Sequence, residues 1–174
     1  MAKDFLNVIE RALMMGISDS INSLTESGEN IHVFGEFPEV EELKFPAVIV
    51  QHTGSGFEEQ MMGQAVTIGT TTGTGEIYGA TYMIHVICEK ETAVQVVSGA
   101  SSASNVHYKQ RRLLNWMMLN VANAVMDMNY STYEEEDTQV IERHLNSWQN
   151  IGFIPELQWY GASAEFLITF TNLR

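Results

Sequence analysis

Histidine and cysteine side chains are the first candidates for metal binding or nucleophilic catalysis in this chain of 174 residues. None of the histidines has an H-x-x-x-H or similar metal-ligand spacing; they are His32, His52, His85, His107 and His144. The sole cysteine, Cys88, follows two apolar residues, so we expect a buried thiol that acts as a small hydrophobe. One cysteine permits neither an intrachain disulfide nor a cysteine zinc site.

Two further stretches resemble binding motifs but lack their defining residues. The Gly-rich segment 73–79 has no Lys-Ser/Thr pair and precedes a predicted strand, whereas a phosphate-binding loop precedes a helix. The acidic run Glu134, Glu135, Glu136 and Asp137 offers hard oxygen ligands, but without the alternating spacing of a calcium loop. No Ser-His-Asp or paired-carboxylate arrangement stands out either. The sequence therefore predicts no cofactor, no metal and no enzyme.

The charge balance excludes other classes of protein. The chain has nine Lys and Arg residues and 22 Asp and Glu residues, which gives a net charge of −13. Proteins that hold nucleic acid through its phosphates, or dock on anionic membranes, need clustered basic residues.

No run of about 18 apolar residues is present, and the N-terminus lacks the apolar run of a signal peptide. With 45% apolar residues, the chain has the composition of one folded domain, which we place at 1–174.

Hydrophobic periodicity predicts the elements of an α+β fold. Helices are expected at 3–24 and 106–128, and strands at 31–34, 47–50, 76–89, 138–145 and 162–171, with a further short strand possible at 65–70. In the strand 76–89, Tyr82, Ile84, Val86 and Cys88 are expected on one face, and the other face is formed by Thr81, Met83, His85 and Ile87. The order predicts a mainly antiparallel sheet packed against two helices, with a long Gly-rich hairpin excursion over 53–76.

The second helix carries an apolar row on the side opposite its core face. Residues follow one another at spacings of four and three across a side that is otherwise partly polar: Arg112, Trp116, Leu119, Asn123 and Met126. Either the first helix lies across this row, or the row is a subunit interface, where Trp, Met and Arg are enriched.

Three basic residues gather at the start of the same helix, where the macrodipole favours acids. They are Lys109, Arg111 and Arg112. An acidic partner would offset this cost, and residues 134–137 or 39–42, from the same or a neighbouring subunit, are candidates. The alternative is a solvated helix end with little energetic consequence.

Taken together, the order of elements resembles that of the tail terminator proteins of tailed bacteriophages and, more loosely, of their neck and head–tail connector relatives. The features that carry the resemblance are the N-terminal helix, the strand opening Phe45-Pro46-Ala47-Val48, the Gly-rich excursion before the strand 78–89, the helix with Arg111-Arg112-Leu113-Leu114, and the last strand 164–170. The similarity covers most of the chain and is one of pattern rather than of a single motif.

The resemblance implies a structural virion protein, assembled in the host cytoplasm, that forms a homo-oligomeric ring, usually a hexamer. Such a ring caps the tail tube protein, stops tube polymerisation and joins the tail to the neck or connector protein, and DNA passes through its lumen. A ring needs two different contact patches per subunit. The row on the second helix would be one, and the excursion with Phe57, Met61 and Met62 the other. An acidic lumen would let DNA slide, because it repels phosphate.

Three alternatives remain open from sequence. One is another virion component, such as a head-completion or tail-tube protein. A second is a small acidic enzyme or ligand-binding domain with a dispersed site, and a third is an assembly factor absent from the particle.

Overall fold

The structure is a computed structural model that describes residues 5–26, 30–39, 41–68, 70–97, 106–130 and 138–173. These residues form two helices, α1 (Phe5–Asn22) and α2 (Gln110–Asp127). The strands are β1 (His32–Phe34), β2 (Ala47–Ile68), β3 (Thr71–Glu89), β4 (Ala93–Val96), β5 (Val106–Lys109), β6 (Thr138–Ile154) and β7 (Trp159–Leu173). The class is α+β, as the hydrophobic pattern predicted.

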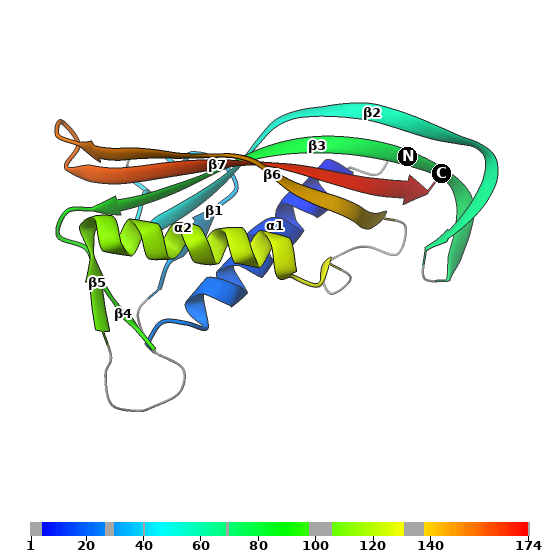
Figure 1. The fold of residues 1–174 in the computed structure, drawn as a ribbon. Helices are drawn as coiled ribbons and strands as arrows, with labels where there is room; N and C mark the ends of the chain where they lie inside the picture. The colour runs from blue at the N-terminus through cyan, green and yellow to red at the C-terminus, as the bar shows by residue number, and fades with distance from the viewer. Residues whose placement is uncertain are drawn as a thin grey trace.

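The main sheet has five strands in the order β1-β2-β3-β7-β6. All neighbours in it are antiparallel except β1 and β2, which are parallel. Strands β4 and β5 form a separate antiparallel ribbon. Both helices lie on the same side of the main sheet (Figure 1).

The core lies between this sheet and the two helices. Ile9, Leu13 and Ile17 recur at helical spacing on α1 and are fully buried. On β3, Tyr82 and Ile84 are also fully buried, and the residues that alternate with them on the outer face are half-buried. The predicted alternation of this strand is therefore confirmed.

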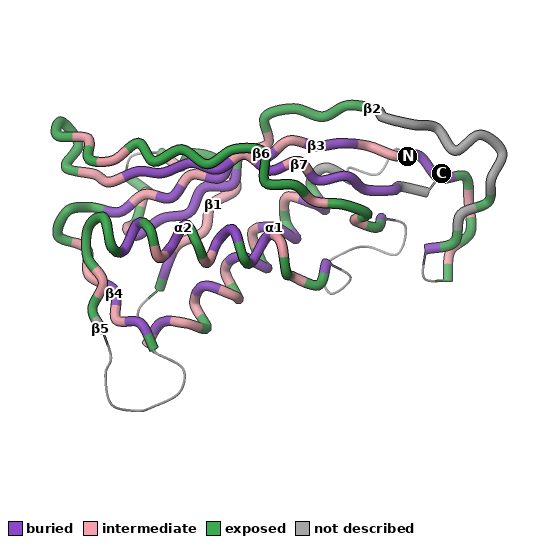
Figure 2. Tube along the Cα trace, viewed as in Figure 1, coloured by how far each residue is buried: buried purple, intermediate pink, exposed green. Residues whose placement is uncertain are grey.

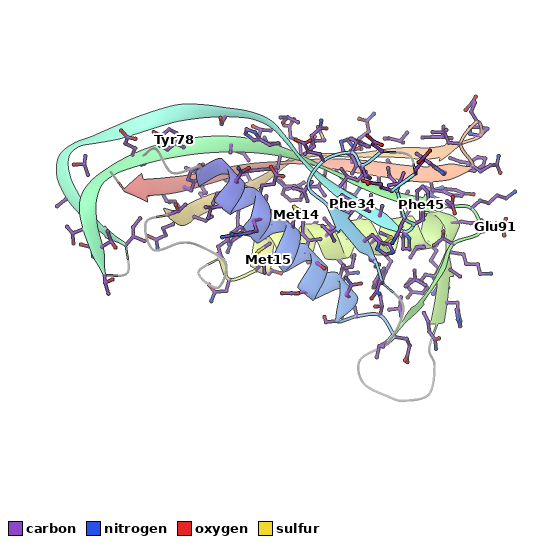
Figure 3. All side chains as sticks on the ribbon, turned by 180° about the vertical axis from the view of Figure 1, so that it is seen from behind. Met14, Met15, Phe34, Phe45, Tyr78 and Glu91 are labelled. Carbon is purple, nitrogen blue, oxygen red and sulfur yellow. The ribbon has the colours of Figure 1, made fainter. Side chains whose placement is uncertain are left out.

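Strands β2 and β3 form a long curved hairpin, which we call the arm where it extends beyond the other strands (Figure 1). Strand β7 accompanies β3 only as far as the pair Gly75↔Leu173, so the end of the arm has two strands. Tyr78, labelled in Figure 3, lies at the base of the arm, where β3 still pairs with β7, and donates a hydrogen bond of 2.6 Å to the Glu76 carboxylate. The predicted hairpin excursion is confirmed, but its first half is continuous with the strand predicted at 47–50.

Several predicted boundaries differ from the structure, and two of them bear on the candidate interface. Helix α2 begins at Gln110 rather than at 106, because residues 106–109 pair with β4 as a short strand. Strand β6 continues to Ile154 rather than ending at 145. Its pairing with β7 shifts register three times, at Val140/Glu142, Leu145/Ser147 and Asn150/Gly152. Each bulge inverts the side-chain alternation, which hid the second half of the strand from a period-two pattern.

Candidate subunit interfaces

The row predicted on α2 is divided between two environments. The Arg112 guanidinium lies 4.3 Å from the centre of the Tyr108 ring, and Trp116 meets the same ring edge-on at 6.0 Å. Tyr108 of β5 therefore covers the N-terminal half of the row. Further along, Met126 is half-buried against the core, whereas Leu119 is 53% exposed.

Helix α1 approaches α2 at the edge of this row, where Asn123 lines the space between the two helices, whereas Leu119 stays exposed. The two helices flank a groove whose α2 side is formed in part by Asn120, Asn123 and Ala124. Trp116 is covered by Tyr108 and also packs against the core. Leu119 remains a candidate for contact with another molecule.

Strand β6 runs alongside α2 in the opposite direction. The side-chain amide of Asn150 donates to the Asn115 side-chain oxygen at 3.5 Å, and Arg143 Nη1 donates to the Met128 carbonyl oxygen at 3.2 Å. The first contact joins the start of α2 to the C-terminal half of β6. The second joins the end of α2 to the N-terminal half of β6. The residues between them therefore face one another across a seam.

Exposed apolar side chains occupy this seam. Leu145 and Trp148 pair in register with Phe166 and Ala164, which are buried on the helix side of the sheet, so both point towards the helical layer. They nevertheless remain 39% and 43% exposed, because β6 is the edge strand. We call Leu119, Leu145 and Trp148 the α2–β6 seam. Sequence analysis identified Leu119 but missed the two residues of β6, whose alternation the register shifts interrupt.

The outer edge of β6 is exposed along almost its whole length (Figure 2). The three register shifts also break the even spacing of its backbone hydrogen-bonding groups. Such an edge is a poor template for another strand. A partner at this place would therefore contact side chains, and Trp148 is the largest that β6 exposes.

The face of the sheet away from the helices carries a polar cluster around His85. His85 Nδ1 lies 2.8 Å from Ser163 Oγ, its Nε2 lies 3.4 Å from Gln51 Oε1, and the Phe37 ring centre is 5.0 Å from the imidazole centre. Burial lowers the pKa of His85. In the described part of the chain no carboxylate bonds to this ring, so the pair lacks the acid of a Ser-His-Asp arrangement.

Cys88 is fully buried, as its neighbours predicted. Burial raises the pKa of its thiol to about 12, and Sγ lies 3.6 Å from the Gln110 carbonyl oxygen. A thiol in this state is a poor nucleophile. Among the described residues, no group of three or more His, Cys, Asp or Glu side chains is arranged to hold a metal ion.

The other predicted interface residues fall into two groups. Lys109 and Arg111 are exposed at the start of α2, and within the described ranges neither forms an ion pair. Glu134, Glu135, Glu136 and Asp137 lie outside the described residues, and so do the side chains of Phe57, Met61 and Met62 on β2.

Comparison with known proteins adds no assignment. No protein-family model matches the chain, and the search of curated proteins found no match. None of the described helices has the length and apolar character needed to cross a membrane.

Proposed function

We propose that this chain is a structural subunit of a tailed-bacteriophage virion, a tail terminator that assembles into a ring, with a hexamer as the expected form. The observation that carries the proposal is the α2–β6 seam, where Leu119, Leu145 and Trp148 leave an apolar surface exposed beside a half-buried Met126. Apolar surface concentrated in this way marks a protein contact. The resemblance in the order of elements supports the choice of family.

The arm supports the same proposal from a different part of the molecule. A ring subunit meets its two neighbours through different patches, because head-to-tail contacts are heterologous. The seam supplies one patch on the body, and the arm reaches away from it (Figure 1). In the proposed ring the arm contacts the next subunit, the tail tube protein or the neck protein.

The net charge of −13 suits a ring through which DNA passes without being held. Basic walls bind DNA by releasing its condensed counterions, and acidic walls do not. We therefore expect acids to outnumber bases on the inner surface of the ring. A lumen lined mainly by Lys109, Arg111 and Arg112 would contradict this expectation.

The decisive experiment measures the mass of the purified full chain by native mass spectrometry and images it in negative stain, alone and with tail tubes. A tail terminator forms closed single rings and binds at tube ends. Long tubes formed by the chain alone would identify it instead as a tail-tube subunit. A chain that stays monomeric alone and with tail tubes would contradict the proposal and favour a small enzyme or ligand-binding domain.

A further inference from the structure

A groove of about 500 Å³ opens between the C-terminal halves of α1 and α2. Asp19 contributes a carboxylate from α1 and Asp127 a carboxylate from α2, with Asn120 and Asn123 between them. The side-chain amide of Asn120 donates to the Trp116 carbonyl oxygen at 2.7 Å, which leaves its own oxygen as an acceptor. No Lys or Arg is among the lining residues that the structure describes.

The helix dipoles add to the negative potential of this groove. It lies near the C-terminal ends of both helices, where the helix macrodipole is negative. Neither helix has a basic residue in its last turn. Arg143 reaches the end of α2 from β6 and bonds the carbonyl oxygen of Met128, which lines the groove, but its own side chain does not line it. The groove is therefore suited to a cationic side chain.

The N-terminal end of α2 carries exposed basic residues, although the helix dipole favours acids there. Lys109 and Arg111 are exposed where the dipole is positive, and the first turn of the helix contains no acid. Arg112 beside them is held over the Tyr108 ring. Arg111 and Asp127 lie about 24 Å apart along the helix axis, at 1.5 Å per residue. Because no side chain spans this distance, the two ends cannot neutralise each other within one molecule.

We infer that the groove receives Arg111 and Lys109 of a second copy of this chain, in a head-to-tail contact. This inference rests on the proposed ring and names one of its subunit contacts. A guanidinium supplies five donors in a fixed fork, which matches the carboxylate of Asp127 and the amide oxygens beside it. The contact places opposite charges together and offsets the unfavourable dipole term at each end of α2. It is heterologous, as a ring requires.

A charge-swap experiment on the full chain tests this pairing. The variants are Arg111→Glu, Asp127→Lys and the double variant that carries both changes, with Glu156→Lys as a control. Glu156 is an exposed acid outside the groove. Sedimentation velocity over a range of protein concentrations measures assembly, and circular dichroism confirms that each variant is folded. Each single reversal is expected to weaken assembly about tenfold or more, whereas the double variant regains most of the loss.

The outcomes separate this inference from the proposed function. If the wild type forms rings and both single reversals assemble like it, the inference is overturned and the ring proposal stands. If the single reversals weaken assembly and the double variant does not recover, the groove and the basic end do not pair, which also overturns the inference. A wild type that remains monomeric overturns both. Weaker wild-type assembly in high salt, with no effect of the Glu156→Lys change, supports the pairing.

Discussion

Replacing Trp148 by alanine tests whether the α2–β6 seam is a subunit contact. The side chain is 43% exposed. Because a tryptophan side chain presents up to about 250 Å², roughly 110 Å² of it is available to a partner. At about 25 cal/mol per Å², burying that area contributes up to ~2.7 kcal/mol to each contact, or about a hundredfold in the dissociation constant. We expect Trp148→Ala to reduce assembly by tenfold to about a hundredfold, since a partner rarely covers the whole area.

Sedimentation velocity of the full chain measures this loss, at a temperature where circular dichroism shows every variant folded. The matched control is Trp159→Ala. Trp159 is half-buried and its ring lies 4.9 Å from that of Phe45, so this change is expected to lower folding stability and leave assembly unchanged. A companion variant, Trp116→Ala, examines the row on α2. There, contact with a neighbouring subunit would compete with the packing of Trp116 against Tyr108. Wild-type assembly by a folded Trp148→Ala variant would refute the assignment of the seam.

Three further predictions concern the fold itself. Cys88 in the native chain should resist alkylation at pH 8 and react quickly once denaturant is added, because its thiol is buried and its pKa is raised to about 12; rapid native labelling would contradict this burial. Burial lowers the pKa of His85, so its contribution to stability is fully present above the unfolded value of 6.5 and is lost as the pH falls through the lowered pKa. Thermal melts between about pH 7 and about pH 5 should therefore show a steeper decline for the wild type than for His85→Gln, and parallel curves would refute this. Asn22 bonds the backbone N–H of Ile31 at 2.8 Å and its carbonyl oxygen at 3.1 Å, so Asn22→Ala should cost about 1–3 kcal/mol, read as a lower Tm, with Asn22→Asp intermediate because it keeps the acceptor. Equal Tm values for the wild type and Asn22→Ala would show that these bonds do not stabilise the fold.

The sequence predicted the helices and the central strands because their patterns are regular over many residues. Ile9, Leu13 and Ile17 show the helical period, and the strand through Tyr82 alternates without interruption. The ribbon of β4 and β5 escaped prediction, because a strand of four residues carries little periodicity and its partner lies beyond the segment 98–105. Its pairing is a tertiary contact rather than a local preference.

The candidate interface was predicted only in part, because some of its residues lie where the sequence pattern is irregular or too short to assign. Leu119 stands out on a helical wheel because the residues around it are polar. Trp148 does not stand out, because register shifts on both sides of it remove the alternation that would assign it a face. Tyr108 was also unpredicted as the cover of Trp116, since it lies in the short strand that sequence analysis placed inside the helix.

The irregular pairing of β6 also limits aggregation of the free chain before the proposed assembly. Between the shifts, regular pairing with β7 runs for at most four residues. The fibrous cross-β state needs segments of about six or seven residues with unbroken spacing. This chain could therefore reach high concentration without seeding fibres from the open edge of β6. Under the proposed function, free subunits would stay available until the tail tube presents its binding surface.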